Sequence, residues 1–307
     1  MILLNQKITR LLASNLPSEA SQWQKGTTYK RNDMVIYQNH IYRNIVNSNT
    51  NVQPDLNTGK WLSFGVDNAH ACIDLRSHTA THLVKGVNSI ELSIPATSID
   101  TLAFGNVKGK ILSITELDSS NKVIKVTNKQ VGSERACSNN WYNYYFCKIP
   151  DRGGNMGVGK AMDVLHNNID VNTARIDIVI GKNTDGIASI GSLIGGTAHQ
   201  LGDTQFGVEI DLIDYSEKVT DKMGVTEIIE RDVQEVTQVT IEIPAKYTQI
   251  VKREVKESLG HVVMIIAEPE KDSNYENLIT LGYIDRFSIR ILNGVTSIGE
   301  MTIKESI

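Results

Sequence analysis

Hydrophobic and polar residues alternate in short runs along the middle of the chain, which is the pattern of strands with one buried face. Clusters of Asn, Ser, Gly and Asp separate these runs, and no long helical period lies between them. The predicted strands cover residues 89–94, 110–116, 122–127, 141–149 and 174–180. Short strands at this spacing favour a β-sandwich, which we place within residues 76–200.

The last third of the chain adds one helical pattern to further strands. After Pro244, apolar residues recur at helical spacing, and Gly260 stands where a helix C-terminal cap is expected. The helical positions are Tyr247, Ile250, Val251, Val255 and Leu259. Strands are predicted at 206–215, 226–243, 261–267, 278–284, 287–292 and 296–303, with a turn at 220–225. We therefore expect residues 201–307 to form an α+β domain with one helix laid on an antiparallel sheet.

The first 75 residues combine a predicted helix with a small β domain. Residues 5–14 would place Ile8, Leu11 and Leu12 on one helical face, and Pro17 would break that helix. Residues 28–45 alternate as strands and predict a hairpin whose turn uses Asn39, because asparagine tolerates positive φ. The chain is thus expected to be mainly β, with a small β module at 1–75, a β-sandwich at 76–200 and an α+β domain at 201–307.

Composition and charge narrow the classes of function. The 307 residues carry a formal net charge of −4, so no global basic field recruits nucleic acid or anionic lipid. The longest apolar runs, such as 262–267, are too short to span a bilayer, so no membrane insertion is expected. No secretory signal is apparent at the start of the chain. Three cysteines do not indicate a disulfide framework, and a reducing cytoplasm is the simple interpretation.

An aromatic frame near the N-terminus is the most informative local feature, because only 6% of the chain is aromatic. Its members are Trp23, Tyr29, Tyr37, Tyr42 and Trp61. Small domains need their aromatic residues inside, whereas sugar-binding sites stack such rings on the flat C–H faces of sugars. The five residues are therefore either the core of a small domain or a carbohydrate-binding platform, and the sequence leaves both interpretations open.

Three further clusters point to no site. The aromatic cluster 141–146 is interpreted as strand packing. Segment 154–161 matches the nucleotide-binding pattern G-x4-G-K, but Ala161 stands where the Mg²⁺-binding hydroxyl belongs, so we expect a loop and no cofactor. The potential ligands Cys72, Asp74, His78 and His82 match no standard zinc spacing, so no metal is expected.

Four carboxylates in the last third, Glu209, Asp211, Asp214 and Glu217, are candidates for a catalytic set. A glycoside hydrolase needs two carboxylates at a fixed separation, one of them with a raised pKa. Glu209 and Asp211 instead alternate with apolar residues, as a solvated strand face does. We therefore expect no catalytic site.

The stretch W-x5-Y-x-x-N-D-M-V-I-Y-x-N-H-I-Y-R, followed by Pro54 and Trp61, resembles the small chitin- and cellulose-binding modules often attached to hydrolases and phage proteins. The resemblance covers about residues 20–65. Asn32-Asp33 replaces the family's usual Gly-Asp. The segment 45–47, Ile-Val-Asn, stands where the family often has an exposed Trp.

Three segments in order along the chain resemble a family of bacteriophage tail-associated structural proteins. They are 2–17 with the aromatic module and 64–74; 190–194 with 202–207, 214–216, 220–221 and Gly224; and 281–288. The resemblance implies a virion protein of the tail tip, baseplate or fibre attachment, assembled in the host cytoplasm. Its implied partners are other phage tail proteins, further copies of itself in a homo-oligomer, and a host surface glycan bound by the N-terminal module.

Two other functions stay open at this point. One is a non-viral or prophage-borne carbohydrate-binding accessory protein. The other is a glycan hydrolase that uses Asp211 and Asp214. Many β domains with polar turns suit a binding or structural part, and such parts usually work as symmetric oligomers in which weak sites add avidity.

Overall fold

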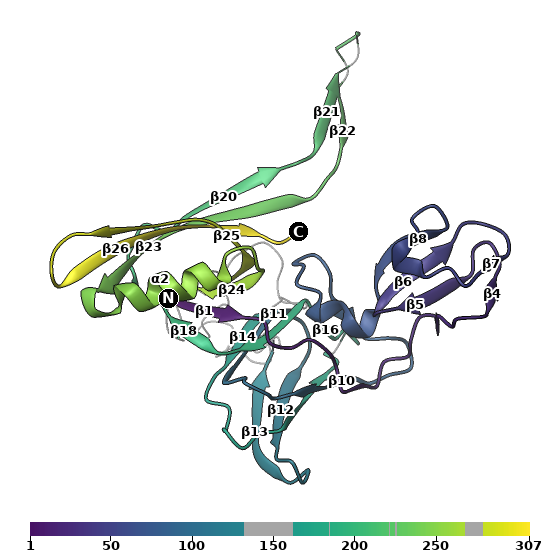
Figure 1. The fold of residues 1–307 in the computed structure, drawn as a ribbon, viewed down its shortest axis with the longest axis horizontal. Coiled ribbons are helices and arrows are strands. Elements are labelled where there is room, and N and C mark those ends of the chain that lie inside the picture. Colours follow the sequence, from purple (N-terminus) through teal and green to yellow (C-terminus); the bar gives the residue numbers. More distant parts are fainter. Residues whose placement is uncertain (132–161, 184, 221, 225, 268–278) are drawn as a thin grey trace, which may run out of the picture.

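The computed structural model describes residues 1–131, 162–183, 185–220, 222–224, 226–267 and 279–307 (Figure 1). Strands predominate in these residues, which contain one α-helix, α2 (Thr248–Ser258). The predicted fold class, mainly β with one helix on an antiparallel sheet, is confirmed. The predicted strand 141–149, the aromatic cluster 141–146 and the glycine-rich segment 154–161 lie outside the described residues.

An eight-stranded sheet forms the C-terminal part of the structure. Its main path runs β18-β1-β24-β25-β26-β23-β19, with β20 also paired to β23. In that order the strands are β18 (Ala198–Gln200), β1 (Ile2–Asn5), β24 (Val263–Ile266), β25 (Ile279–Ile291), β26 (Thr296–Glu305), β23 (Val233–Pro244), β19 (Asp203–Thr204) and β20 (Glu209–Asp214). The predicted runs 278–284 and 287–292 are one strand, β25. A bulge between Ile284 and Arg286 carries its pairing with β26 through the intervening polar residues.

Helix α2 covers one face of this sheet, as predicted. Its buried residues recur at one-turn spacing, and Val251 and Val255 belong to the same core cluster as Ile241 and Ile303 of the sheet. A short 3₁₀ turn (Ala245–Tyr247) leads into the helix. Gly260 closes it with a φ of +82°, the left-handed conformation of a C-terminal cap, which glycine adopts without steric cost.

Strand β1 ties the N-terminus into the C-terminal sheet. It is hydrogen-bonded on both sides, to β18 and to β24. The chain then runs on to β2 (Ala13–Ser14), which pairs with β10 (Ser89–Pro95). The domain boundaries expected near residues 75 and 200 stay a prediction, but strand pairing crosses both of them.

The helix predicted for residues 5–14 is wrong. The segment is extended, and its backbone bonds to other strands: the Lys7 N–H donates to the Gly195 carbonyl (2.7 Å) and the Leu12 N–H to the Ser93 carbonyl (2.7 Å). The Gln6 amide adds bonds to the same region, donating to the Leu193 carbonyl at 3.1 Å. These distant partners satisfy the backbone that a local helix would have satisfied, so tertiary pairing overrides the local periodicity.

Two sheets in the middle of the chain pack face to face as a β-sandwich-like unit. The larger runs β13 (Val123–Gln130), β12 (Ile111–Leu117), β15 (Arg175–Gly181), β10 and β2; the smaller runs β14 (Met162–His166), β11 (Thr101–Val107) and β17 (Ser192–Gly196). One apolar cluster joins them, with Leu92 and Ile178 from the larger sheet and Leu102 and Phe104 from the smaller. The predicted strands 89–94, 110–116, 122–127 and 174–180 correspond to β10, β12, β13 and β15. A two-stranded ribbon, β9 (Thr81–His82) with β16 (Ser189–Ile190), flanks this unit.

The three-stranded sheet is buried on both faces and forms a middle layer. Leu102 and Phe104 of β11 face the sandwich core, while Ala103 belongs to a second cluster with Leu4 and Met264 of the eight-stranded sheet. The order of layers is therefore α2, the eight-stranded sheet, the three-stranded sheet and the five-stranded sheet. Strands buried on both sides lack the alternation of apolar and polar residues, which is why β11 and β17 are missing from the sequence prediction.

The N-terminal module is a small, separate pair of sheets (Figure 1). Its strands are β3 (Ser21–Gln22), β5 (Met34–Tyr37), β6 (His40–Asn44) and β8 (Trp61–Val66) in one sheet and β4 (Thr28–Tyr29) with β7 (Asn49–Thr50) in the other. The predicted hairpin is confirmed between β5 and β6, where Gln38 and Asn39 both have positive φ as a type I′ turn requires. The loop 47–59 also contains β7 and a 3₁₀ turn (Pro54–Leu56), and a second 3₁₀ helix (Asn68–Ile73) leads out of the module.

Replacing Leu4 tests whether the contact between the sheets is central to stability. Leu4 is fully buried between the eight-stranded and three-stranded sheets, so Leu4→Ala should lower the free energy of unfolding by about 2–5 kcal/mol. The matched control is Leu12→Ala at a half-exposed position, which should change it by less than about 1 kcal/mol. Chemical denaturation measures both. Equal, small effects would contradict the layered packing described above.

Candidate functional site

Two members of the aromatic frame form the core of the N-terminal module. Trp61 and Tyr29 are 2% and 7% exposed, and their rings meet edge-to-face with centroids 5.4 Å apart. The Trp61 Nε1–H donates to the Val52 carbonyl (3.0 Å), and the Tyr29 hydroxyl accepts from the Gln24 N–H (2.7 Å). Their polar atoms are bonded inside the module, so these two rings hold the domain together.

The other three members of the frame lie at the edge of that core. Trp23 and Tyr42 are half-buried against it, and Trp23 meets Tyr37 edge-to-face at 5.6 Å. The Tyr37 hydroxyl accepts a hydrogen bond from the Gln53 amide. Burial, with smaller contributions from Asp55 and Tyr37, raises the pKa of Tyr42. The structure therefore divides the five residues into a buried pair and a half-exposed set of three.

A buried polar residue that the sequence analysis missed organises the same module. Asn44 is fully buried, and its Nδ2 lies within 3.1 Å of the carbonyls of Tyr29, Lys30 and Val46. Its Oδ1 accepts from the Asn49 amide at 3.1 Å. Asn44 thus closes the irregular chain around the core. The sequence could have indicated this role, because Asn44 is a polar residue at a strand position that faces the core.

The opposite face of the module's sheet carries exposed apolar residues. Met34, Leu62 and Phe64 are exposed, with Phe64 at 55%. The Arg43 guanidinium lies 4.8 Å from the centre of the Phe64 ring, within cation–π range. None of these residues is in the aromatic frame, because a lone Phe in a strand gives no sequence signal of its own.

A two-stranded ribbon projects from the eight-stranded sheet (Figure 1). It consists of β20 and the start of β23, continued by β21 (Glu217–Thr220) and β22 (Thr226–Ile229). We call residues 209–232 the arm. All described arm residues are exposed except the half-buried Ser216. The arm carries several exposed apolar residues, and it contains the candidate catalytic carboxylates Glu209, Asp211, Asp214 and Glu217.

Those carboxylates serve the arm's own structure or face solvent. Hydrogen bonds from Ser216 hold the pKa of Asp214 below its usual value, which is the reverse of what a general acid needs. Glu217 pairs with Arg231 across the ribbon at 2.7 Å. Glu209 and Asp211 are exposed on β20. Glu209 and Asp211 therefore lie on a solvent-exposed strand face, as expected from the sequence.

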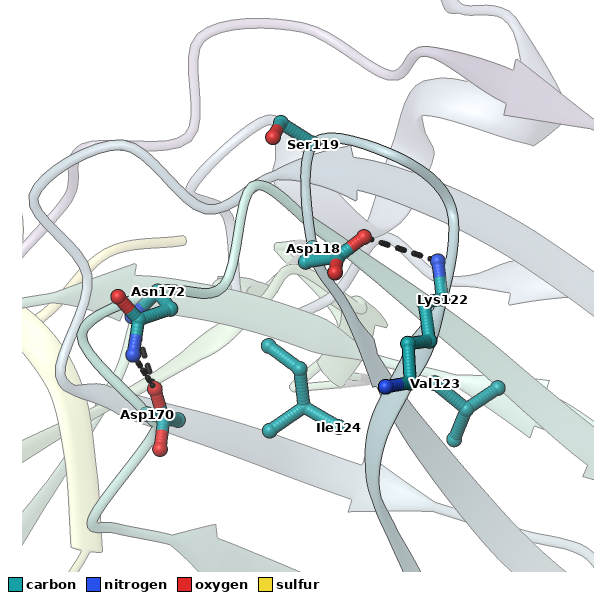
Figure 2. A pocket seen from close by; sticks show the side chains of 7 residues that line it. All are labelled: Asp118, Ser119, Lys122, Val123, Ile124, Asp170 and Asn172. Carbon is teal, nitrogen blue, oxygen red and sulfur yellow. Dashed lines mark hydrogen bonds between the residues drawn. The ribbon is translucent and has the colours of Figure 1, made fainter.

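A surface hollow of about 630 Å³ lies beside the turn between β12 and β13 (Figure 2). Its lining residues are Asp118, Ser119, Lys122, Val123, Ile124, Asp170 and Asn172. Asp118 accepts from the backbone N–H groups of Ser120 and Lys122, and these bonds, Lys122 first, lower its pKa. Asp170 likewise accepts from the Asn172 backbone and side chain. Both carboxylates are committed to shaping turns.

The potential metal ligands near residue 75 are placed in other roles. Cys72 is buried, and burial raises the pKa of its thiol to about 11, so it is an unreactive core group. Asp74 accepts from the Thr79 hydroxyl (2.6 Å) and the Arg76 N–H (3.0 Å). Within the described ranges, no group of three or more His, Cys, Asp or Glu residues is arranged to hold a metal ion.

A buried charged network lies in the described part of the sandwich. Glu116 is fully buried and accepts from the Asp170 N–H (2.9 Å) and the Thr173 hydroxyl (3.2 Å). Its other oxygen lies 3.2 Å from His166 Nε2 and 3.8 Å from Lys125 Nζ. Burial lowers the pKa of His166, although Glu116 acts in the opposite direction. The network joins β12 to β14 and to the turn before β15.

No family model and no curated protein matches the chain. Among the described residues, no helix has both the length and the apolar character needed to cross a membrane. Function is therefore inferred from the structure of the N-terminal module and the arm.

Substitutions in β8 separate core rings from surface rings. Trp61→Ala should destabilise the module by about 3–5 kcal/mol, because it empties the centre of the small core. Phe64→Ala, in the same strand but exposed, is the matched control and should cost less than about 1 kcal/mol. Hydrogen exchange of amides in residues 20–66 reports the local stability. A Trp61→Ala variant with unchanged protection would contradict the core assignment.

The buried histidine predicts a pH dependence of stability. Above the usual histidine pKa of 6.5, His166 is neutral in both states; below it, the unfolded state binds the proton first because the folded pKa is lower. The free energy of unfolding should therefore decrease as the pH falls from 6.5 toward the folded pKa. His166→Gln should flatten this part of the curve, whereas His261→Gln, at an exposed position, should leave it unchanged. Denaturation at a series of pH values measures all three proteins.

Proposed function

We propose that the chain is a structural subunit of a bacteriophage tail, at the tip, the baseplate or the attachment of a fibre, and that it works as a homo-oligomer beside other tail proteins. The observation that carries this proposal is the arm. It leaves the folded body and presents apolar residues on a ribbon with no covering layer among the described residues. A part that assembles with neighbours has a use for such an element.

The energetics of the arm favour a bound partner. Its exposed apolar residues are Ile210, Leu212, Ile213, Tyr215, Val219, Met223, Ile228 and Ile229, with Met223 at 88% and Leu212 at 70%. An isolated two-stranded ribbon is marginally stable in water, and an exposed strand edge readily pairs with another chain. Within the described residues, β20 has a hydrogen-bonded neighbour on one side only. Burial of these side chains in an assembly would supply the missing stabilisation.

Several segments of the resemblance to tail-associated proteins lie on the same part of the fold, whereas the aromatic module, 64–74 and 190–194 lie outside it. Segment 281–288 lies within β25, segment 202–207 contains β19, and segments 214–216 and 220–221 lie in the arm. The head segment contains β1, which pairs within that sheet. These separate stretches of sequence therefore belong to one sheet and its projection, which supports a shared structural role.

Contact with a surface glycan is a second role that one observation favours. Trp23, Tyr37 and Tyr42 are half-exposed rings at one edge of the N-terminal module, and the buried Nε1–H of Trp23 has no hydrogen-bond partner. Rings of this kind can stack on sugars while a free donor bonds a sugar hydroxyl. A carbohydrate-binding accessory protein is the corresponding alternative. The hydrolase alternative is less favoured, because the lowered pKa of Asp214 does not suit a general acid.

Immunogold electron microscopy tests the main proposal. Antibody raised against the purified chain should label the tail of phage particles from the host that produces it, near the tip or baseplate. Mass spectrometry of purified tails should find the chain in a multiple copy number. An antibody against the capsid is the control and should label heads alone. Chain that stays in the soluble lysate and is missing from purified particles would contradict the proposal.

A further inference from the structure

The arm combines exposed apolar side chains with an excess of negative charge. Residues 209–232 contain eight acidic and three basic residues. Arg231 is already paired with Glu217, whereas Glu209, Asp211 and Glu227 are exposed. The twelve residues from β20 to the end of β21 extend about 40 Å if fully stretched. The arm is therefore suited to reach a surface that is apolar and basic.

The C-terminal sheet carries such a surface at one end. The turn between β25 and β26 exposes Ile291, Leu292 and Val295. The Ala245 N–H donates to the Val295 carbonyl (2.8 Å), which joins this turn to the start of α2. The adjoining surface then continues along the helix.

The outward side of α2 supplies the positive charge. Residues 246–257 contain four basic and two acidic residues, and the basic ones, Lys246, Lys252, Arg253 and Lys256, are all exposed. Exposed Tyr247 and Ile250 lie among them. Of the two acidic residues, Glu254 lies 3.1 Å from both His199 and Arg253, so Arg253 is already paired and Lys246, Lys252 and Lys256 carry the remaining positive charge. We call the turn 291–295 together with residues 246–257 the basic end.

The arm and the basic end lie at opposite ends of one strand. The register pairs Pro244 of β23 with Thr296, beside the turn of the basic end, and pairs Val236 with Lys304. The arm continues from the other terminus of β23, at Val233 (Figure 1). The outer part of the arm extends away from the basic end, so it is placed to meet the basic end of another copy rather than its own.

We propose that the arm of one copy docks on the basic end of a second copy, in a head-to-tail contact. The inference rests on the proposed homo-oligomeric role and names its interface. The acidic arm meets exposed lysines, and its apolar side chains cover Tyr247, Ile250 and the turn 291–295. A contact between two different surfaces of the same chain repeats from copy to copy. It closes into a ring if the rotation allows, and otherwise grows into a filament.

Charge reversal on each surface tests this contact. The arm variant is Asp211→Lys with Glu227→Lys, and the helix variant is Lys252→Glu with Lys256→Glu. Lys85→Glu with Lys122→Glu, on exposed positions of the sandwich, is the control with the same charge change as the helix variant. Circular dichroism and thermal unfolding establish that each variant is folded. Sedimentation velocity of the full chain then measures self-association over a range of concentrations.

The wild type and the control should associate, and each test variant alone should associate at least about tenfold more weakly, because each introduced side chain faces residues of its own charge sign in the contact. An equimolar mixture of the two test variants should recover association, since the lysines introduced into one arm then face the glutamates introduced into the partner's helix. A wild type that stays monomeric, or a helix variant that associates like the wild type, would overturn the inference.

The two proposals fail separately. If gold label marks the tail but the mixture of variants does not recover association, the head-to-tail contact is wrong and the tail assignment stands. If the variants behave as described but no label reaches the tail, the contact stands and the tail assignment is wrong.

Discussion

Leu3 and Leu4 are neighbours on one four-residue strand, and both are fully buried because they point to opposite faces of the eight-stranded sheet. Leu3 packs into the cluster under α2, and Leu4 packs into the cluster shared with β11 and β17. The same alternation occurs in β24, where Val263 faces the helix side and Met264 the sandwich side. Each buried face is covered only because another layer is present, so the layers depend on one another. The close contact is also visible at Gly196, where a Cβ would overlap the Asn5 carbonyl.

This rigid stack explains how an exposed ribbon can be tolerated. The base of the arm continues β23, which is hydrogen-bonded to β26 over nine residue pairs, so its direction is set by the sheet. The outer part has solvent on both sides and gains little from the body. A firmly anchored base with a poorly stabilised end suits a segment that completes its packing in an assembly. The stable sheet thus fixes the base of the arm, while the outer part of the arm lacks packing partners within the described residues.

The N-terminal module shows how a small domain divides its aromatic residues. Trp61 and Tyr29 fill the centre, where Asn44 ties down the irregular backbone around them. Trp23 and Tyr42 pack half-buried against this core, and Tyr37 contacts Trp23 outside it, because so small a core cannot enclose all five rings. In the sandwich, the buried Glu116 has its oxygens bonded to neighbouring groups, which is the condition for keeping a carboxylate inside a protein. In both the N-terminal module and the sandwich, a buried polar side chain thus bonds backbone groups that lie outside regular strand pairing.

Local sequence determined the elements whose partners are close or whose pattern is unambiguous. The apolar period after Pro244 and the cap at Gly260 define α2 because a helix satisfies its own backbone. Asn39 defines the β5–β6 hairpin because the turn conformation depends on the residue itself. The strands β10, β12 and β15 were readable because each has one face toward the core and one outward. The solvated character of Glu209 and Asp211 followed from the same alternation.

Only the tertiary structure decided the features that depend on distant partners. Residues 5–14 have a helical period, but the carbonyls of Ser93 and Gly195 hold them extended. The run 262–267 predicts a strand, yet nothing local says that both its faces are covered, or by which layers. The aromatic frame identified five rings without separating core from edge, because ring burial depends on Gln24 and Val52 of other loops and on Asn44 of β6. The hydrogen bonds of a turn or helix join residues that are close in sequence, so the local sequence predicts them. The burial of a side chain depends on residues that are distant in sequence and pack around it.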